Sequence, residues 1–226
     1  TVPSPDPAFA GIDVPIASSF LLSSKKGNEA FIEPVVDRQA KTITYRIKYG
    51  GTPDERAAAK TGTKAQRGAH FTCVLSGSAI EPDYVKACGQ KGEMRAHLMA
   101  IVADGHRGRV YVAGNDQNSK SAILAKPELK PGTPLPRHPQ YIGVLGYGFD
   151  YFSDLFTDRQ LLALNTFSDL MGEVREQIEN DALAEGMHPE QISLRDGGSG
   201  AKAYADAVSV YLCFANSKMS DRCSTI

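Results

Sequence analysis

Five prolines near the middle of the chain divide it into two parts of different character: Pro127, Pro131, Pro134, Pro136 and Pro139. A proline fixes φ and lacks an N–H donor, so neither a helix nor a central strand runs through such a stretch. We therefore predict a linker over residues 127–140, between a β-rich module over 1–126 and a helical segment over 141–226. Because strands and helices are segregated along the chain, the predicted fold class is α+β, with an N-terminal antiparallel, ribbon-like module.

The N-terminal part contains short runs of β-branched and aromatic residues, which are typical of antiparallel strands. In the clearest run, over residues 41–49, isoleucine and tyrosine alternate with threonine, arginine and lysine. This alternation predicts a strand with one buried and one solvated face. Further segments are predicted as strands over 17–24, 29–36, 70–75, 97–102 and 109–112, and as a short helix over 82–88.

Positive charge gathers on the third predicted strand and on the stretch that follows it. Residues 50–68 have no apolar period, which predicts a long mobile loop. The candidate DNA-binding residues are two on the polar face of the strand and three on the loop: Arg46, Lys48, Lys60, Lys64 and Arg67. Such residues can neutralise phosphates and release counterions. Two alternatives stay open: a solvated strand face, or a face docked on the acidic region over 150–196.

Two long helices are predicted in the C-terminal part. Thr157-Asp-Arg-Gln160 has the spacing of a capping box, and apolar residues follow it at positions 161, 164, 167, 171, 174 and 178. This helix is expected to end near Gly186. The second helix is expected after a flexible glycine-rich loop, with Ser199 as its N-cap and a buried stripe at positions 204, 208, 211, 212, 215 and 219.

The stretch Cys73-Val-Leu-Ser76-Gly77 is similar to half of a zinc knuckle in which the second cysteine has become serine. A partner knuckle could lie over residues 3–11, but that stretch contains neither cysteine nor histidine. No metal ligand set is therefore predicted, and the chain is expected to fold without metal. No Cys/His or Ser/His/Asp spacing predicts catalytic residues either.

The composition excludes several classes of protein. Among 226 residues the net charge is −1, and the four cysteines are irregularly spaced. This favours a reducing, cytoplasmic location over a disulfide framework. A membrane helix needs about 20 apolar residues, and no apolar run approaches that length, so no membrane partner is expected. Because the chain opens at Thr1 without a methionine, we expect an internal piece of a longer polypeptide.

Longer stretches of the sequence resemble a known family: SSFLLSSKKGNEAFIEPVVD, CVLSGSAIEPDYVKACGQKGEMRAHLMAIVADGHRGRVYV, DLFTDRQLLALNTFSDLM and GGSGAKAYADAVSVYLCFA. They are similar to the middle of a bacterial family of adenine-specific DNA methylases with a zinc-ribbon domain, often encoded in anti-phage gene clusters. Members commonly carry paired cysteines where this chain has PSPDPAFAG and CVLSG. The resemblance thus implies a branch that kept the ribbon-like scaffold and lost the zinc, with Cys73 at a former ligand position.

The resemblance also implies what the parent protein does. It would flip an adenine from the duplex and transfer a methyl group from S-adenosylmethionine to the exocyclic nitrogen. The family's cofactor motif and its Asp-Pro-Pro-Tyr motif do not occur in these residues. This segment is therefore expected to supply no catalytic and no cofactor-binding residue, and to be inactive alone. Two roles stay open: positioning or recognising DNA for the parent enzyme, and docking other defence proteins as an assembly module without touching DNA.

Overall fold

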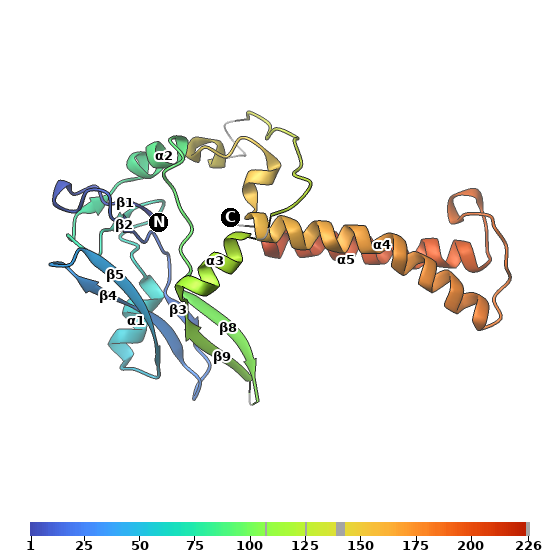
Figure 1. Cartoon of the computed structure of the whole chain (residues 1–226), viewed down its shortest axis with the longest axis horizontal. Coiled ribbons are helices and arrows are strands. Elements are labelled where there is room, and N and C mark those ends of the chain that lie inside the picture. Colours follow the sequence, from blue (N-terminus) through green and yellow to red (C-terminus); the bar gives the residue numbers. More distant parts are fainter. Residues whose placement is uncertain (107, 125, 139–142, 225–226) are drawn as a thin grey trace. The chain divides into compact units, whose positions relative to one another are not determined.

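A computed structural model describes residues 1–106, 108–124, 126–138 and 143–224 (Figure 1). It contains antiparallel β-sheets and α-helices, which confirms the α+β class. The chain forms two compact units, one of Thr1–Ser121 with Leu135–Asp150 and one of Ala122–Pro134 with Tyr151–Ile226. The residues of the predicted linker are therefore divided between the two units.

The main sheet of the first unit has three antiparallel strands, β3 (Leu21–Ser23), β4 (Ala30–Asp37) and β5 (Thr42–Tyr49). In the β4–β5 pair, Ala30 lies opposite Tyr49 and Asp37 lies opposite Thr42. Exposure alternates along most of β5, as the sequence predicts, so Ile43, Tyr45 and Ile47 face inward. The turn between the strands is closed by the Asp37 carboxylate, which accepts hydrogen bonds from two backbone N–H groups.

The predicted mobile loop over 50–68 is wrong, because helix α1 (Pro53–Thr61) lies within it. Thr52 and Glu55 form a capping box, and Pro53 stands at the first helical position, where its missing N–H costs nothing. The helix buries only Ala59, so it has no apolar period that the sequence could reveal. It packs beside the sheet in a small core that also contains Phe20, Phe31 and Ile32.

Two short hairpins form the other core of the first unit. One joins β1 (Val2–Pro3) to β2 (Asp13–Val14), and the other joins β6 (Phe71–Thr72) to β7 (Ala79–Ile80). The predicted strand over 70–75 is thus shorter than expected, because a turn begins at Cys73. The predicted short helix is present as α2 (Pro82–Gln90). Their shared core contains Val2, Val14, Phe71, Cys73, Leu75, Ile80, Val85 and Cys88.

A third hairpin, β8 (Ala100–Gly105) with β9 (Gly108–Ala113), is hydrogen-bonded to the main sheet through Tyr49. The Tyr49 hydroxyl donates to the carbonyl of Tyr111 at 2.8 Å and accepts from its N–H at 2.8 Å.

Helix α3 (Asp116–Leu124) follows, and the 3-10 turns η2 (Gly143–Tyr147) and η3 (Phe152–Leu155) lie further along the chain. At Gly89 of α2 an added Cβ would lie 2.3 Å from the Tyr147 carbonyl oxygen, so glycine permits this approach.

The second unit is dominated by the long helices α4 (Asp158–Ala184) and α5 (Ala201–Cys223) (Figure 1). The predicted capping box is confirmed, because Thr157 accepts from the N–H of Gln160, whose side chain accepts from the N–H of Thr157. Among the described residues no helix combines the length and the apolar composition that crossing a bilayer demands.

The predicted start of α5 needs a correction. Gly200, not Ser199, is its N-cap, and the N–H groups of both residues donate to the Glu190 carboxylate at 3.0 and 2.7 Å. The connection between the long helices includes the short turn η4 (Leu194–Asp196). The glycines after this turn permit close packing, since a Cβ at Gly198 would lie 2.2 Å from the Ile192 carbonyl oxygen. The glycine-rich stretch is therefore a packed turn and not a flexible loop.

Candidate functional site

Cys73 lies at the centre of a knuckle-like turn. Its thiol is 3.6 Å from the Ser4 hydroxyl of the other hairpin and is also hydrogen-bonded by Ser76 and by the Leu75 N–H. Burial acts to raise the pKa of the Cys73 thiol, but these hydrogen bonds outweigh it and leave the pKa lower than usual. The polar partners of this thiol thus include two serine hydroxyl groups. Among the described residues no three His, Cys, Asp or Glu side chains are grouped to hold a metal ion.

The two predicted DNA-binding residues on β5 are paired with carboxylates of the same unit. Arg46 donates to Glu33 of β4, which lies directly opposite it in the sheet. The hydrogen bond from Arg46 lowers the pKa of Glu33. Lys48 donates to Glu55 of α1 at 2.5 Å, and this hydrogen bond lowers the pKa of Glu55. The strand therefore offers less free positive charge than its sequence indicates.

The three residues predicted on a loop have different surroundings. Lys60 is exposed in α1, and with Arg56 and Glu29 it lines a shallow pocket of about 240 Å³. Lys64 lies over the ring of the core residue Phe71, with its ammonium 5.4 Å from the ring centroid. Arg67 is exposed, and within the described residues neither Lys60 nor Arg67 has a hydrogen bond or ion pair to its side chain. The five predicted residues therefore have different partners and different exposure.

A partly buried charge pair links the two long helices. Arg175 of α4 donates to the Asp206 carboxylate of α5 at 2.7 Å, and the N–H of Leu194 donates to the same carboxylate at 3.0 Å. The Leu194 N–H, followed by Arg175, lowers the pKa of Asp206. A second link runs from Asn216 to the hydroxyl of Ser168 at 3.0 Å. These links fix which faces of α4 and α5 meet.

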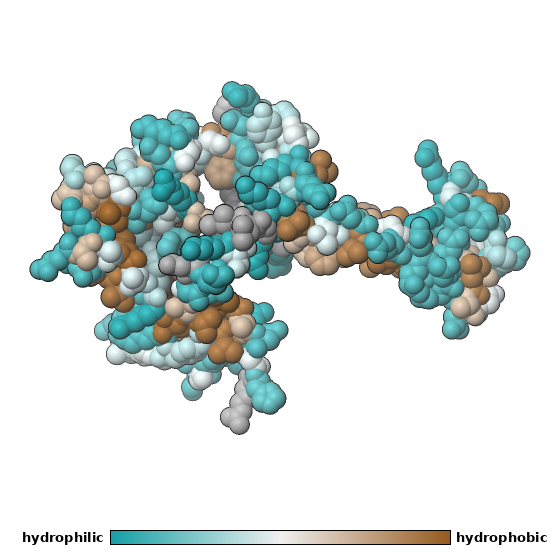
Figure 2. Space-filling view, viewed as in Figure 1, coloured by the Kyte–Doolittle hydropathy of each residue, from teal (hydrophilic) through white to brown (hydrophobic). Residues whose placement is uncertain are grey.

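The apolar stripes predicted for α4 and α5 are only partly buried. The inward edge is covered, as at Leu161 and Ala182, but Phe167 is 46% exposed and Tyr211 is 75% exposed. Each helix covers only a narrow part of the surface of the other. The predicted apolar stripes are wider than this contact. We call the exposed and half-buried apolar residues on one side of the pair the apolar strip: Phe167, Val174, Ile178, Met187, Tyr204, Val208 and Tyr211. Figure 2 shows apolar side chains along these helices among polar ones.

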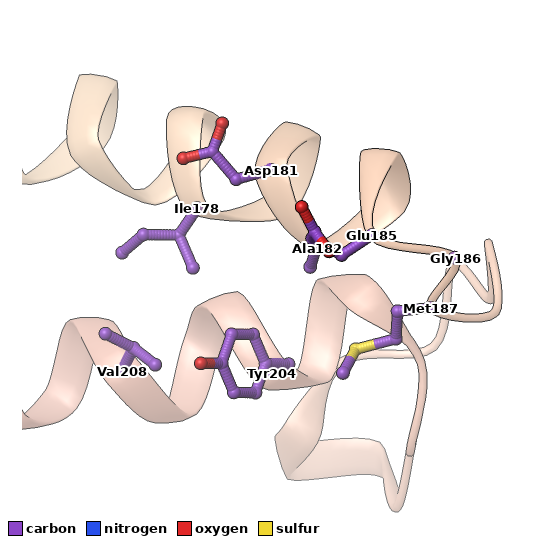
Figure 3. Close-up of a pocket in the computed structure, with 8 residues that line it drawn as sticks. All are labelled: Ile178, Asp181, Ala182, Glu185, Gly186, Met187, Tyr204 and Val208. Carbon is purple, nitrogen blue, oxygen red and sulfur yellow. The ribbon is translucent and has the colours of Figure 1, made fainter.

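One end of the apolar strip deepens into a pocket of about 590 Å³ between the ends of the two helices (Figure 3). Ile178 and Ala182 of α4, Tyr204 and Val208 of α5, and Met187 beyond Gly186 form its walls. Asp181 and Glu185 complete the lining. Sequence reasoning missed this pocket because Met187 lies after the helix end. The sequence did carry a signal for it. The predicted stripes of α4 and α5 contain more apolar positions than two helices can cover on each other.

Helix α4 carries a surplus of negative charge. Its carboxylates without a cation partner among the described residues are Asp169, Glu173, Glu176, Glu179, Asp181 and the C-cap Glu185. Like charges three or four positions apart on a helix repel, and those near its C-terminus also meet the negative end of the helix dipole. The carboxylates at the pocket thus repel one another and the helix dipole. A cation bound from outside would reduce this repulsion.

Comparison with known proteins adds no relative from which a function could be transferred. No family model matches the chain, and neither a curated protein nor a solved structure is found to match it. The case for a function therefore rests on the chain's own residues, and the apolar strip with its acidic pocket is a surface that the helix pair leaves partly uncovered.

Proposed function

We propose that this chain is a non-catalytic assembly module that docks a protein partner on the apolar strip of α4 and α5. The observation that supports this role is the surplus of apolar surface on the long helices. Val174 of α4 is 36% exposed, and Tyr204 and Tyr211 of α5, which are seven positions apart, are 48% and 75% exposed. Large contiguous apolar surface is uncommon on monomers and marks sites of protein contact.

The proposal keeps the parent enzyme that the sequence resemblance implies. The parent would be a cytoplasmic, S-adenosylmethionine-dependent DNA adenine N6-methyltransferase, and the docked protein would belong to the same defence system. A second copy of this chain is a poor occupant, because two α4 helices with unpaired carboxylates would repel each other. A protein of opposite charge fits the strip better.

The experiment places a photo-crosslinking amino acid at Tyr211 in the protein expressed in its native host. The expected result is one predominant protein adduct, which mass spectrometry identifies. A second substitution in the strip, Phe167→Ser, is expected to weaken that adduct at least severalfold. The matched control carries the crosslinker at Thr44, an exposed position of β5, and should not give the same adduct.

Two outcomes would contradict the assembly role while the protein stays folded. One is an identical set of adducts at Tyr211 and at Thr44, which would show only random collision. The other is an adduct at Tyr211 that disappears with nuclease, which would show that the strip faces nucleic acid. An adduct of twice the chain's own mass would identify a second copy as the occupant and overturn the charge argument.

DNA positioning stays the second candidate, and the charges of Lys60 and Arg67 support it. If the chain contacts phosphates, Lys60→Ala with Arg67→Ala should reduce the slope of log affinity against log salt by about two units. The matched control, Arg46→Ala with Lys48→Ala, removes the same charge from residues already paired with Glu33 and Glu55. Fluorescence anisotropy with duplex DNA measures both. Equal slopes for the two double variants would exclude a specific role for Lys60 and Arg67.

A further inference from the structure

The pocket between α4 and α5 combines apolar walls with a carboxylate at its edge. In Figure 3, Ile178 points from α4 toward α5, and Tyr204 and Met187 lie on the opposite side of the same gap. Glu185 extends along this gap, whereas Asp181 stands on the outer side of α4. An apolar group that enters the pocket would therefore pass close to Glu185, and Asp181 would remain within reach of a longer side chain at the rim.

The two carboxylates are poorly placed for the stability of the helix itself. Asp181 and Glu185 are four positions apart, and Glu185 is the C-cap of α4, where the last turn contains no basic residue. Asp181 accepts a neutral hydrogen bond from Gln177 at 2.7 Å, and the described residues provide no cation to either carboxylate. Repulsion within the pair and the helix dipole both act against them. A cationic group bound from outside would reverse both effects.

We infer that the pocket binds a basic amphipathic helix, whose apolar side chains pack on Ile178, Tyr204 and Met187 and whose lysine or arginine pairs with Glu185 and Asp181. This inference rests on the proposed docking role and names the chemistry of the partner. An amphipathic helix presents apolar residues at positions i, i+3, i+4 and i+7, which matches a strip that runs along a helix pair. Its basic flanks meet the acidic surface of α4, where a second copy or DNA would be repelled.

The pocket has the size and composition that such binding needs. Its volume of about 590 Å³ lies within the range of specific ligand sites, which hold a large apolar group and a few polar contacts. Tyr204 adds an aromatic face that can contact a guanidinium or ammonium group as well as an aliphatic chain. The cation therefore has two kinds of partner, a carboxylate and a ring.

The probe for the experiment is a synthetic amphipathic peptide of about fourteen residues, with leucine on one face and lysine on the other. Fluorescence anisotropy with a labelled peptide measures its affinity for the 226-residue chain. Two comparison peptides separate the contributions. One has glutamate in place of lysine, and the other has the same leucines and lysines in an order without an apolar face.

The leucine–lysine peptide is expected to bind best, and Asp181→Asn with Glu185→Gln is expected to weaken it about fivefold at low salt. The matched control is Glu173→Gln with Glu176→Gln, which removes two carboxylates of α4 outside the pocket lining. The control should retain most of the affinity. Circular dichroism of both variants checks that the helices are intact.

The outcomes separate this inference from the docking role on which it rests. If both charge variants lose affinity equally, or if the scrambled peptide binds as well, binding is diffuse attraction and the inference is wrong. If the glutamate peptide binds better and Phe167→Ser weakens it, the strip docks a partner of another charge, and only the inference fails. If no peptide binds and the Tyr211 crosslinks also fail, the docking role fails as well.

Discussion

Replacement of Gly62 by alanine is expected to lower the free energy of unfolding of the first unit by about 3 kcal/mol or more. Gly62 ends α1 with φ +62° and ψ −134°, a conformation that a side chain strains. A Cβ there would also lie 2.4 Å from the Ala17 carbonyl oxygen and 2.8 Å from the Ser19 nitrogen. Both neighbours are backbone, so relief requires the end of α1 to move away from residues 17–19.

Gly68→Ala is the matched control for this prediction. Gly68 also has a positive φ, +84°, but the nearest atom to its Cβ would be in the His70 side chain at 3.8 Å. Its replacement should therefore cost only the conformational strain, about 1 kcal/mol. Urea denaturation followed by tyrosine fluorescence gives both values. Equal losses for the two variants would mean that the close approach of Gly62 to residues 17–19 contributes nothing.

Replacement of Asp206 by alanine is expected to destabilise the helical unit by about 2 kcal/mol. The carboxylate side chain is only 19% exposed, and it accepts hydrogen bonds from Arg175 of α4 and from the Leu194 N–H. Its loss leaves the partly buried Arg175 guanidinium without its partner. Asp169→Ala removes a carboxylate of α4 that pairs with no cation among the described residues, and this control should change the stability little. Thermal unfolding followed by circular dichroism distinguishes the two.

The same contact predicts how the stability depends on pH. Because the Leu194 N–H and Arg175 lower the pKa of Asp206 in the folded state, its contribution is complete above the unfolded value of about 3.9. As the pH falls through the lower folded pKa, the carboxylate is protonated and the contribution disappears. The difference in stability between the unmodified chain and Asp206→Asn should therefore be constant near neutral pH and shrink below about pH 4. A difference that grows on acidification would contradict this assignment.

The sequence predicted elements whose signals are local. The alternation over 41–49 predicted β5 and its inward face, and the spacing from Thr157 to Gln160 predicted the start of α4. Helix α1 was missed because the prediction relied on apolar period, and α1 buries little beyond Ala59. Thr52 and Glu55 with Pro53 between them carried the signal instead, since they form a capping box with proline at the first helical position.

Charge and burial were harder to predict because they depend on neighbours that are distant in the sequence. The pairing of Arg46 with Glu33 follows from the β4–β5 register, and that of Lys48 with Glu55 follows from the packing of α1. Neither can be derived from a list of basic residues. Similarly, an apolar stripe shows which side of a helix turns inward, but not whether a neighbour is wide enough to cover Tyr211.

The contact between the two knuckle-like hairpins has a consequence for the order of folding during synthesis. Ser4 and Cys73 are 69 positions apart, and the Thr1 nitrogen donates to the carbonyl of Arg95, 94 positions away. The ribosome therefore has to release the chain beyond Arg95 before the first hairpin meets its partners, whereas β3, β4, β5 and α1 lie within residues 21–61. The main sheet can thus form early, while residues 2–14 stay without their partners. In this interval Val2 and Val14 are accessible to chaperones.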